Sequence, residues 1–182
     1  MSEPTTNEPT TNEPTTNEPT TNEPTTNAAK EIAANAAKEI AANAAERPSA
    51  GVQALDRLVG TWKVTGGAEG TVRYEWMPGG YFLLQHVDLT QFGEPATGIE
   101  VIGNLRPFGE PTGEDVVSRY YDSLGNTFDY VYELTGDKLT IWGGVKGGPA
   151  YFEGTFSPDG ATLTGGWVYP GGGGYRSTMT RV

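Results

Sequence analysis

The sequence contains no cysteine and a single histidine, His86. Without cysteine there are no disulfides, no thiolate metal ligands and no cysteine nucleophile. A metal site built from histidine ligands needs more than one histidine, and neither an HExxH motif nor paired histidines at ligand spacing occur. We therefore expect no metal site.

Basic residues are also few, since 12 Lys and Arg stand against 23 Asp and Glu and give a net charge of −11. No basic cluster is present, which disfavours binding to nucleic acid or to an anionic membrane surface. No apolar run approaches the roughly 20 residues of a membrane-spanning helix. The first residues, MSEPTTNEPT, lack the basic and apolar regions of a signal peptide. We expect a soluble cytoplasmic protein, and its oligomeric state stays open.

The first 46 residues contain no aromatic residue, and Ile32 and Ile40 are their only large aliphatic side chains. Residues 1–27 carry five tandem EPTTN repeats, and proline at every fifth position forbids a helix. We predict an extended, solvated arm there; the alternative is a stalk that binds a partner or itself. Residues 28–46 follow an NAAKEIAA repeat of good helix formers, which predicts a helical spacer. Its eight-residue period is no heptad and does not favour a coiled coil.

All nineteen aromatic residues lie in residues 47–182, so the core must form there. The sequence VQALDRLVG predicts a short helix that ends at Gly60. Runs rich in β-branched and aromatic residues follow, separated by turn sequences such as MPGG, DSLGN and SPDG. Such short connections join neighbouring antiparallel strands, so we predict an up-and-down meander. The ten expected strands span residues 61–66, 69–76, 80–89, 97–105, 115–122, 126–134, 137–142, 149–156, 162–169 and 174–182.

Ten such strands remove their exposed edges when the first and the last strand pair. We therefore predict an all-β fold, an antiparallel up-and-down barrel of about ten strands over residues 51–182, with the short helix capping one end. Barrels of eight or more strands can enclose a small ligand. Closure also makes the first and the last strand neighbours, where an Arg over a Trp would form a favourable cation–π pair.

Gly60 and Trp62 in the sequence GTW, with Arg181 near the end of the last strand, resemble the signature of lipocalin-like (calycin-type) barrels. In that family the Trp lies across the closed end and the Arg stacks over it, so the resemblance gives these three residues a structural role. The strings LDRLVGTWKV, YEWMPGGYFLLQHVDL, GIEVIGN and YYDSLGNTFDYVYEL resemble a bacterial family of lipocalin-like barrels without an assigned function, over about residues 53–182. That family implies a small-molecule cavity and offers no catalytic residue.

The ten-strand plan is also distantly similar to nitrobindin-like haem barrels, which ligate iron through a His late in the chain. The late sequences LTGGWVYP and GYRSTMTRV contain no His. We therefore expect no haem and no other cofactor, unless His86 binds the iron from another wall.

His86 acquires a neighbour when the strands around the TQFGEPA loop pair as a hairpin. A hairpin centred near Gly93 places His86 opposite Glu100. A His beside a carboxylate among apolar residues is suited to proton transfer. Both are candidate ligand contacts and, in an alternative hypothesis, catalytic residues. The other interpretation is an ion pair that fixes the strand register, or a His on the outer wall.

A second hairpin, centred near Leu124, places Arg119 opposite Asp129. If that face points inward, Arg119 could bind a carboxylate or phenolate, with Tyr121 beside it; the alternative is a salt bridge in the wall. Trp76 and Trp142 lie late in their strands, where a pocket mouth needs flat apolar surface. The opposite face carries an aromatic stripe typical of wall packing: Tyr120, Phe128, Tyr130 and Tyr132.

No residue pattern demands catalysis, since neither GxSxG nor the GxxxxGK[ST] phosphate loop is present. We predict non-catalytic binding of a small apolar or amphipathic molecule in the barrel. One alternative is a barrel-type cyclase or isomerase that uses His86 and Glu100 for acid–base chemistry. Another is an interaction protein that acts through the repeat arm.

Overall fold

The structure, a computed structural model, describes residues 26–45 and 48–182, without the side chains of residues 26 and 39–45. The chain divides into two units, residues 1–43 and 44–182. Helix α1 (Thr26–Ala45) confirms the helix expected in the Ala-rich repeat, and Ile32 is exposed on it. Residues 1–25 of the predicted arm lie outside the described residues. The predicted domain boundaries stay predictions.

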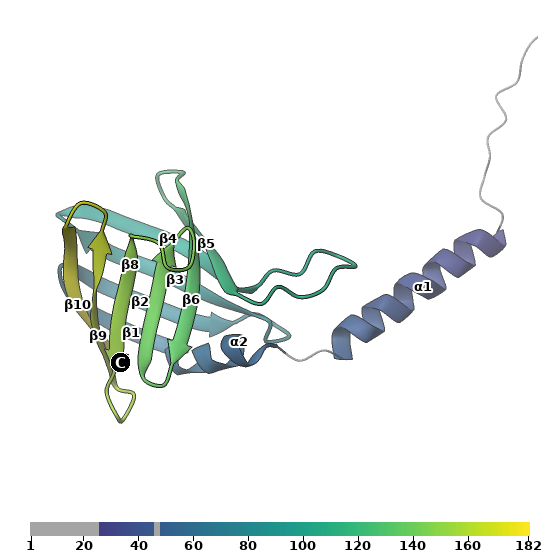
Figure 1. Cartoon of the computed structure of the whole chain (residues 1–182), viewed down its shortest axis with the longest axis horizontal. Coiled ribbons are helices and arrows are strands. Elements are labelled where there is room, and N and C mark those ends of the chain that lie inside the picture. The colour runs from purple at the N-terminus through teal and green to yellow at the C-terminus, as the bar shows by residue number, and fades with distance from the viewer. Residues whose placement is uncertain (1–25, 46–47) are drawn as a thin grey trace, which may run out of the picture. The chain divides into compact units, whose positions relative to one another are not determined.

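Ten antiparallel strands close into a barrel in which β1 pairs with β10 (Figure 1). Each of the other pairs joins strands that are neighbours in the sequence. This confirms the predicted all-β fold and fits a lipocalin-like fold in general. The strands are β1 (Gly60–Gly66), β2 (Ala68–Trp76), β3 (Phe82–Gln91), β4 (Glu94–Asn104), β5 (Val116–Asp122), β6 (Thr127–Thr135), β7 (Lys138–Gly143), β8 (Tyr151–Phe156), β9 (Thr162–Tyr169) and β10 (Gly173–Arg181).

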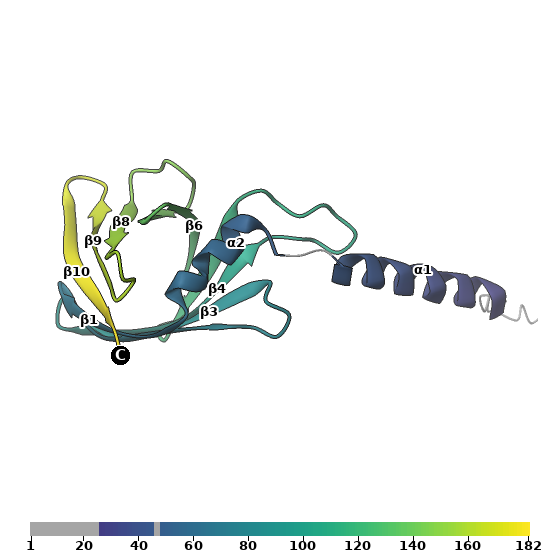
Figure 2. The same ribbon diagram turned by 90° about the horizontal axis from the view of Figure 1, so that it is seen from below.

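A short helix lies at one end of the barrel (Figure 2). It consists of α2 (Ala50–Ala54) and the 3₁₀ turn η1 (Leu55–Leu58). The side chain of Ser49 caps it by accepting a hydrogen bond from the backbone N–H of Val52, at 3.2 Å. Val52, Leu55 and Leu58 are fully buried in the barrel core. The apolar face predicted from the sequence is therefore the face that covers this end, the closed end.

Trp62 fills the closed end and is completely buried. Its indole N–H donates to the carbonyl oxygen of Leu58 at 2.7 Å, and Arg181 is its partner across the β1–β10 pair. The guanidinium carbon of Arg181 lies 4.2 Å from the centre of the Trp62 ring. The same guanidinium donates to the carbonyl oxygens of Val59 and Arg57. The predicted stacking of Arg on Trp is therefore present.

Gly60 completes this arrangement, since its φ of +123° is a conformation that only glycine adopts easily. A Cβ atom at this position would lie 2.7 Å from Nη1 of Arg181. The glycine two residues before Trp62 therefore leaves room for the guanidinium that covers the indole.

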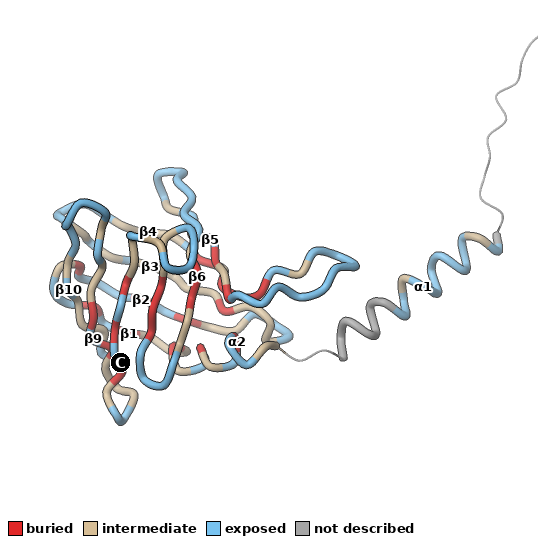
Figure 3. The backbone as a smooth tube through the Cα atoms, viewed as in Figure 1, coloured by how far each residue is buried: buried red, intermediate tan, exposed pale blue. Residues whose placement is uncertain are grey.

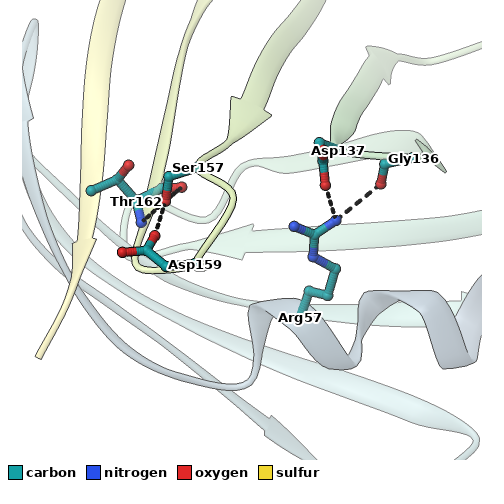
Figure 4. Close-up of polar contacts among 6 residues, drawn as sticks. All are labelled: Arg57, Gly136, Asp137, Ser157, Asp159 and Thr162. Carbon is teal, nitrogen blue, oxygen red and sulfur yellow. Dashed lines mark hydrogen bonds and ion pairs between the residues drawn. The ribbon is translucent and has the colours of Figure 1, made fainter.

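Arg57 ties η1 to the turn between β6 and β7 (Figure 4). Its Nη1 donates to the carbonyl oxygen of Gly136 at 3.0 Å and to Oδ1 of Asp137 at 2.8 Å. Its guanidinium also lies 4.4 Å from the centre of the Phe156 ring. Figure 4 further shows the turn after β8, where Ser157 donates to Asp159 and accepts from the backbone of Thr162.

The predicted register of β3 against β4 is wrong by one residue. Gln85, and not His86, lies opposite Glu100, and His86 lies opposite Ile99. The reason is the turn: Phe92 and Gly93 have φ values of 53° and 85° and form a two-residue loop. Positive φ at both central residues is the type I′ geometry of tight hairpins. A Phe rarely adopts it, so the sequence suggested a longer loop with a different centre.

Candidate functional site

The barrel encloses a cavity of about 710 Å³, within the roughly 300–1,000 Å³ of small-molecule sites. Its lining reaches residues of the hairpin turns opposite the closed end, among them Ser123, Leu124 and Gly144. This end is the mouth of the cavity. Figure 3 shows that burial concentrates on the strands while the hairpin turns are exposed. A small molecule could therefore enter at the mouth and be enclosed by the strands.

One part of the cavity wall is apolar. It is formed by the first two and the last four strands of the barrel, β1 and β2 together with β7 to β10. Within it, the ring centres of Trp167 and Phe152 lie 5.8 Å apart, and Trp167 also contacts Tyr130 of the adjoining β6, at 5.7 Å. The apolar lining residues of these strands are Val64, Ala68, Val72, Leu139, Ile141, Phe152, Leu163, Trp167 and Met179.

A polar stripe crosses the other part of the wall, over β2 to β6. Tyr74 and Gln85 are direct cross-strand partners, and so are Gln85 and Glu100. Nε2 of Gln85 donates to the hydroxyl of Tyr74 at 2.9 Å. Ser118 and Tyr132 extend the stripe, because both hydroxyls donate to Oε1 of Glu100, that of Tyr132 at 2.9 Å. The cavity thus combines a largely apolar lining, to which Val87 and Leu89 of β3 also contribute, with this hydrogen-bonding stripe. Gln91 and Tyr169 form a further polar contact in the lining, at 3.2 Å.

Glu100 is the central residue of this stripe. Only 4% of it is exposed, yet it lines the cavity. Both hydrogen bonds reach Oε1, so Oε2 is the carboxyl oxygen that remains for a bound molecule. Burial raises the pKa of Glu100 to about 7, against the opposing effect of the hydrogen bonds from Ser118 and Tyr132. Near neutral pH this carboxyl can therefore accept or donate a hydrogen bond inside the cavity.

The tyrosines of the stripe stay neutral. Burial, followed by the charge of Glu100, raises the pKa of Tyr74 and of Tyr132 well above the ordinary value of a phenol. Their hydroxyls therefore keep their protons at any physiological pH and act as fixed dipoles around the carboxyl.

The charged residues that line the cavity are acids. Among the described residues they are Glu100, Asp122 and Asp129, and no Lys, Arg or His is in the lining. The two aspartates lie near the mouth and are already engaged. Asp122 accepts hydrogen bonds within its own turn, from the backbone N–H of Leu124 and from Asn126. Asp129 pairs with Arg119, which leaves Glu100 as the carboxyl free to meet a ligand.

The predicted residues fall on both faces of the wall. Glu100 lines the cavity, whereas His86 is absent from the lining and its Nε2 lies 2.9 Å from Oε1 of Glu75. Neighbouring residues of a strand point to opposite faces, so Gln85 turns to the cavity and His86 to the outer wall. The expected His86–Glu100 pair is therefore not formed.

Arg119 lies opposite Asp129, as predicted. Its guanidinium binds both carboxylate oxygens, at 2.6 and 2.9 Å, and both side chains are more than half exposed. Tyr121 is also half exposed, and neither it nor Arg119 lines the cavity. This pair matches the wall salt bridge, the alternative named from the sequence.

The two tryptophans also lie outside the cavity lining. The indole N–H of Trp76 donates to Oδ1 of Asp56 at 2.9 Å. Trp142 borders a separate depression on the outer face of β6 to β8. The ammonium of Lys146 lies over the Trp142 ring, 5.7 Å from the ring centre. The cavity lining does not support ligand contacts by the other five predicted residues, and these contacts stay predictions. The five are His86, Arg119, Tyr121, Trp76 and Trp142.

In the part of the chain that the structure describes, no group of three or more His, Cys, Asp or Glu residues is placed to hold a metal ion. Within the same residues, no helix combines the length and the apolar character needed to cross a membrane. Comparison with models of known protein families finds no match, and a search of curated proteins finds no similar sequence.

Sequence reasoning missed Tyr74, Gln85 and Ser118 as site residues. The signal was present in β3, where His86 and Asp88 lie on one face and Leu83 and Val87 on the other. A face with two charged residues is the solvent face of a barrel wall. That alternation alone would have placed Gln85 inside, next to Glu100.

Proposed function

We propose that the barrel binds a small amphipathic molecule in its cavity without chemical conversion. One observation carries this proposal: a cavity of about 710 Å³ with a mouth, a largely apolar lining and a polar stripe centred on Glu100. An apolar chamber with a few convergent polar groups is the usual construction of a small-molecule site. The apolar part of the ligand would lie against β7 to β10, and its polar group would face Glu100.

The alternative, an acid–base enzyme, requires His86 beside Glu100 in the cavity, and the structure does not place His86 there. His86 faces the outer wall and contacts Glu75, so a His–carboxylate couple in the cavity does not support that reaction. The interaction protein that acts through the repeat arm rests on residues outside the described ones and stays a prediction, as does a cytoplasmic location.

Membership of the calycin-type barrels is part of the same proposal. It is supported by Gly60, Trp62 and Arg181, whose contacts at the closed end match the arrangement that the family resemblance implies. A closed end with an open mouth opposite is the form of barrel that binds ligands inside.

The test measures the affinity of the full chain for decanol by isothermal titration calorimetry. Val87 lines the cavity from β3, so Val87→Trp fills part of the space a ligand needs. Thr90 is exposed on the opposite face of the same strand, and Thr90→Trp is the matched control. We expect Val87→Trp to weaken decanol binding at least about tenfold and Thr90→Trp to leave it unchanged. Equal affinity of all three proteins, with circular dichroism showing that each is folded, would refute binding in the cavity.

A further inference from the structure

The charges of the cavity wall restrict the chemistry of its ligand. No basic residue among the described ones lines the cavity, while Glu100 does, with Oε1 held by Ser118 and Tyr132 and Oε2 outside those hydrogen bonds. A bound carboxylate or phosphate would meet this acid without any compensating cation, which is costly away from water. Anionic ligands such as fatty acids are therefore disfavoured.

A cation meets the opposite situation. Glu100 is buried and its Oε1 is already held by two donors, so the carboxylate is fixed in position before a ligand arrives. A charge-assisted hydrogen bond from an ammonium to a carboxylate is stronger than a neutral one. Tyr132 donates to this carboxyl, and Tyr74 and Tyr130 also line the cavity; aromatic rings attract cations as well.

The geometry points to an amphipathic amine as the ligand, its ammonium group bound by the carboxylate of Glu100 and its apolar part against the aliphatic wall. This inference rests on the proposed binding function and names the ligand class for the same cavity. No bond is made or broken: the amine arrives protonated, and Glu100 is ionised in the complex.

Proton release is a consequence of this pairing. Without ligand, the pKa of Glu100 is raised to about 7 by burial, so below that pH the carboxyl is mostly protonated. An ammonium ion favours the ionised form, so binding at pH 6.5 must release a proton to the buffer. Affinity for the amine therefore rises with pH up to about 7 and then levels off, until the amine itself loses its charge.

The experiment compares decylamine, decanol and decanoate, which share one apolar chain and differ in the charge of the head group. Each is titrated calorimetrically into the full-length protein at pH 7.5. We expect decylamine to bind about tenfold more tightly than decanol, and decanoate more weakly than either. In Glu100→Gln, whose amide oxygen can still accept from Ser118 and Tyr132, the ratio of the amine and alcohol affinities falls to about one.

The matched control is Glu153→Gln, which removes one negative charge from the outer face of β8, where Glu153 pairs with Lys138 at 2.7 Å. It should keep the tenfold preference. At pH 6.5, titrations in buffers of different ionisation enthalpy should detect proton release with decylamine in wild type and not in Glu100→Gln.

The outcomes separate the two claims. Decanol bound without a preference for decylamine, or a preference that survives Glu100→Gln, overturns the amine while cavity binding stands. Decanoate bound most tightly overturns it as well. Binding of none of the three molecules overturns the proposed function together with the inference.

Discussion

The closed end and the cavity are built from the same ten strands, yet their interiors are opposite in kind. At the closed end, Trp62 and the helix residues Leu55 and Leu58 fill the barrel completely and are no more than 1% exposed. Further along the same strands, the interior holds about 710 Å³ of space and a buried carboxyl. The filled end is therefore the part that suits stability, and the open part of the same barrel is the part for which we propose binding.

The difference comes from the helix together with Trp62 of β1, which fills the space that the helix covers. Strand residues alone leave space in a ten-stranded barrel, because its interior is wider than a layer of side chains can fill. At one end, η1 brings its own apolar side chains and Arg57 fastens it to the β6–β7 turn. We find no comparable covering element in the lining at the mouth, where the described residues belong to strands and hairpin turns. Packing at one end thus permits an open interior at the other.

The largest effect should come from replacing the indole of the closed end. We expect Trp62→Ala to lower the free energy of unfolding by about 3–5 kcal/mol, because a buried Trp leaves a cavity behind. Trp167→Ala, which removes the same side chain from the partly exposed cavity wall, should cost less than about 2 kcal/mol. Urea denaturation of both variants measures the two values. An equal loss of unfolding free energy in both variants would contradict the distinction between a filled closed end and an open cavity.

The next effect concerns pH and the buried carboxyl. The pKa of Glu100 is about 7 in the folded protein and 4.5 in its ordinary state. Between these values the folded protein holds more protons than the unfolded chain, so Glu100 makes stability fall as pH rises from about 4.5 to 7. Glu100→Gln lacks this loss. Its free energy of unfolding should therefore gain about 3 kcal/mol relative to wild type between pH 4.5 and pH 8.

Denaturant unfolding at several pH values measures this effect of pH on the free energy of unfolding. Glu153→Gln provides the control, because it removes a carboxyl from the exposed outer wall. A difference between Glu100→Gln and wild type that stays constant with pH would show that the carboxyl is not buried in the folded protein.

A smaller effect is expected for the guanidinium that covers the closed end. Arg181→Gln loses the stacking on Trp62 and the hydrogen bonds to two backbone carbonyls, and we expect a loss of about 1–2 kcal/mol. Arg176→Gln removes the same charge from an exposed position of β10. Thermal unfolding should show a lower melting temperature for the first variant alone; similar melting temperatures would mean that Arg181 contributes only its charge.

The smallest effect is expected for the pair on the outer wall. Arg119→Gln breaks an ion pair whose partners are both exposed, and water compensates such losses. The melting temperature and the affinity for decanol should both stay within experimental error of wild type. A marked loss of affinity would restore Arg119 as a ligand contact.

The sequence was sufficient to predict the closed end and the strand order. Turn sequences and β-rich runs marked all ten strands. The resemblance of the GTW motif and Arg181 to the lipocalin-like signature implied how the first and last strands meet. These features depend on local chemistry and on pairing between neighbours, which short turns dictate. The β5–β6 hairpin was also predicted in register, with Arg119 opposite Asp129.

The candidate site was predicted less well, because its residues depend on register. A shift of one residue exchanges the two faces of a strand, and the Phe92–Gly93 turn produced that shift in β3. Glu100 was found, but with His86 as its neighbour in place of Gln85. The hydrogen bonds from Ser118 and Tyr132 cross several strands and follow the slant of the barrel, which no local pattern specifies.

The most direct test is a ¹³C NMR titration of the Glu100 side-chain carboxyl, assigned by its disappearance in Glu100→Gln. We expect its midpoint near pH 7 in the free protein, a shift of its signal when decanol is added, and a lower midpoint when decylamine is added. A carboxyl that titrates near pH 4.5 and does not respond to either molecule would contradict a buried acid at the wall of a ligand cavity.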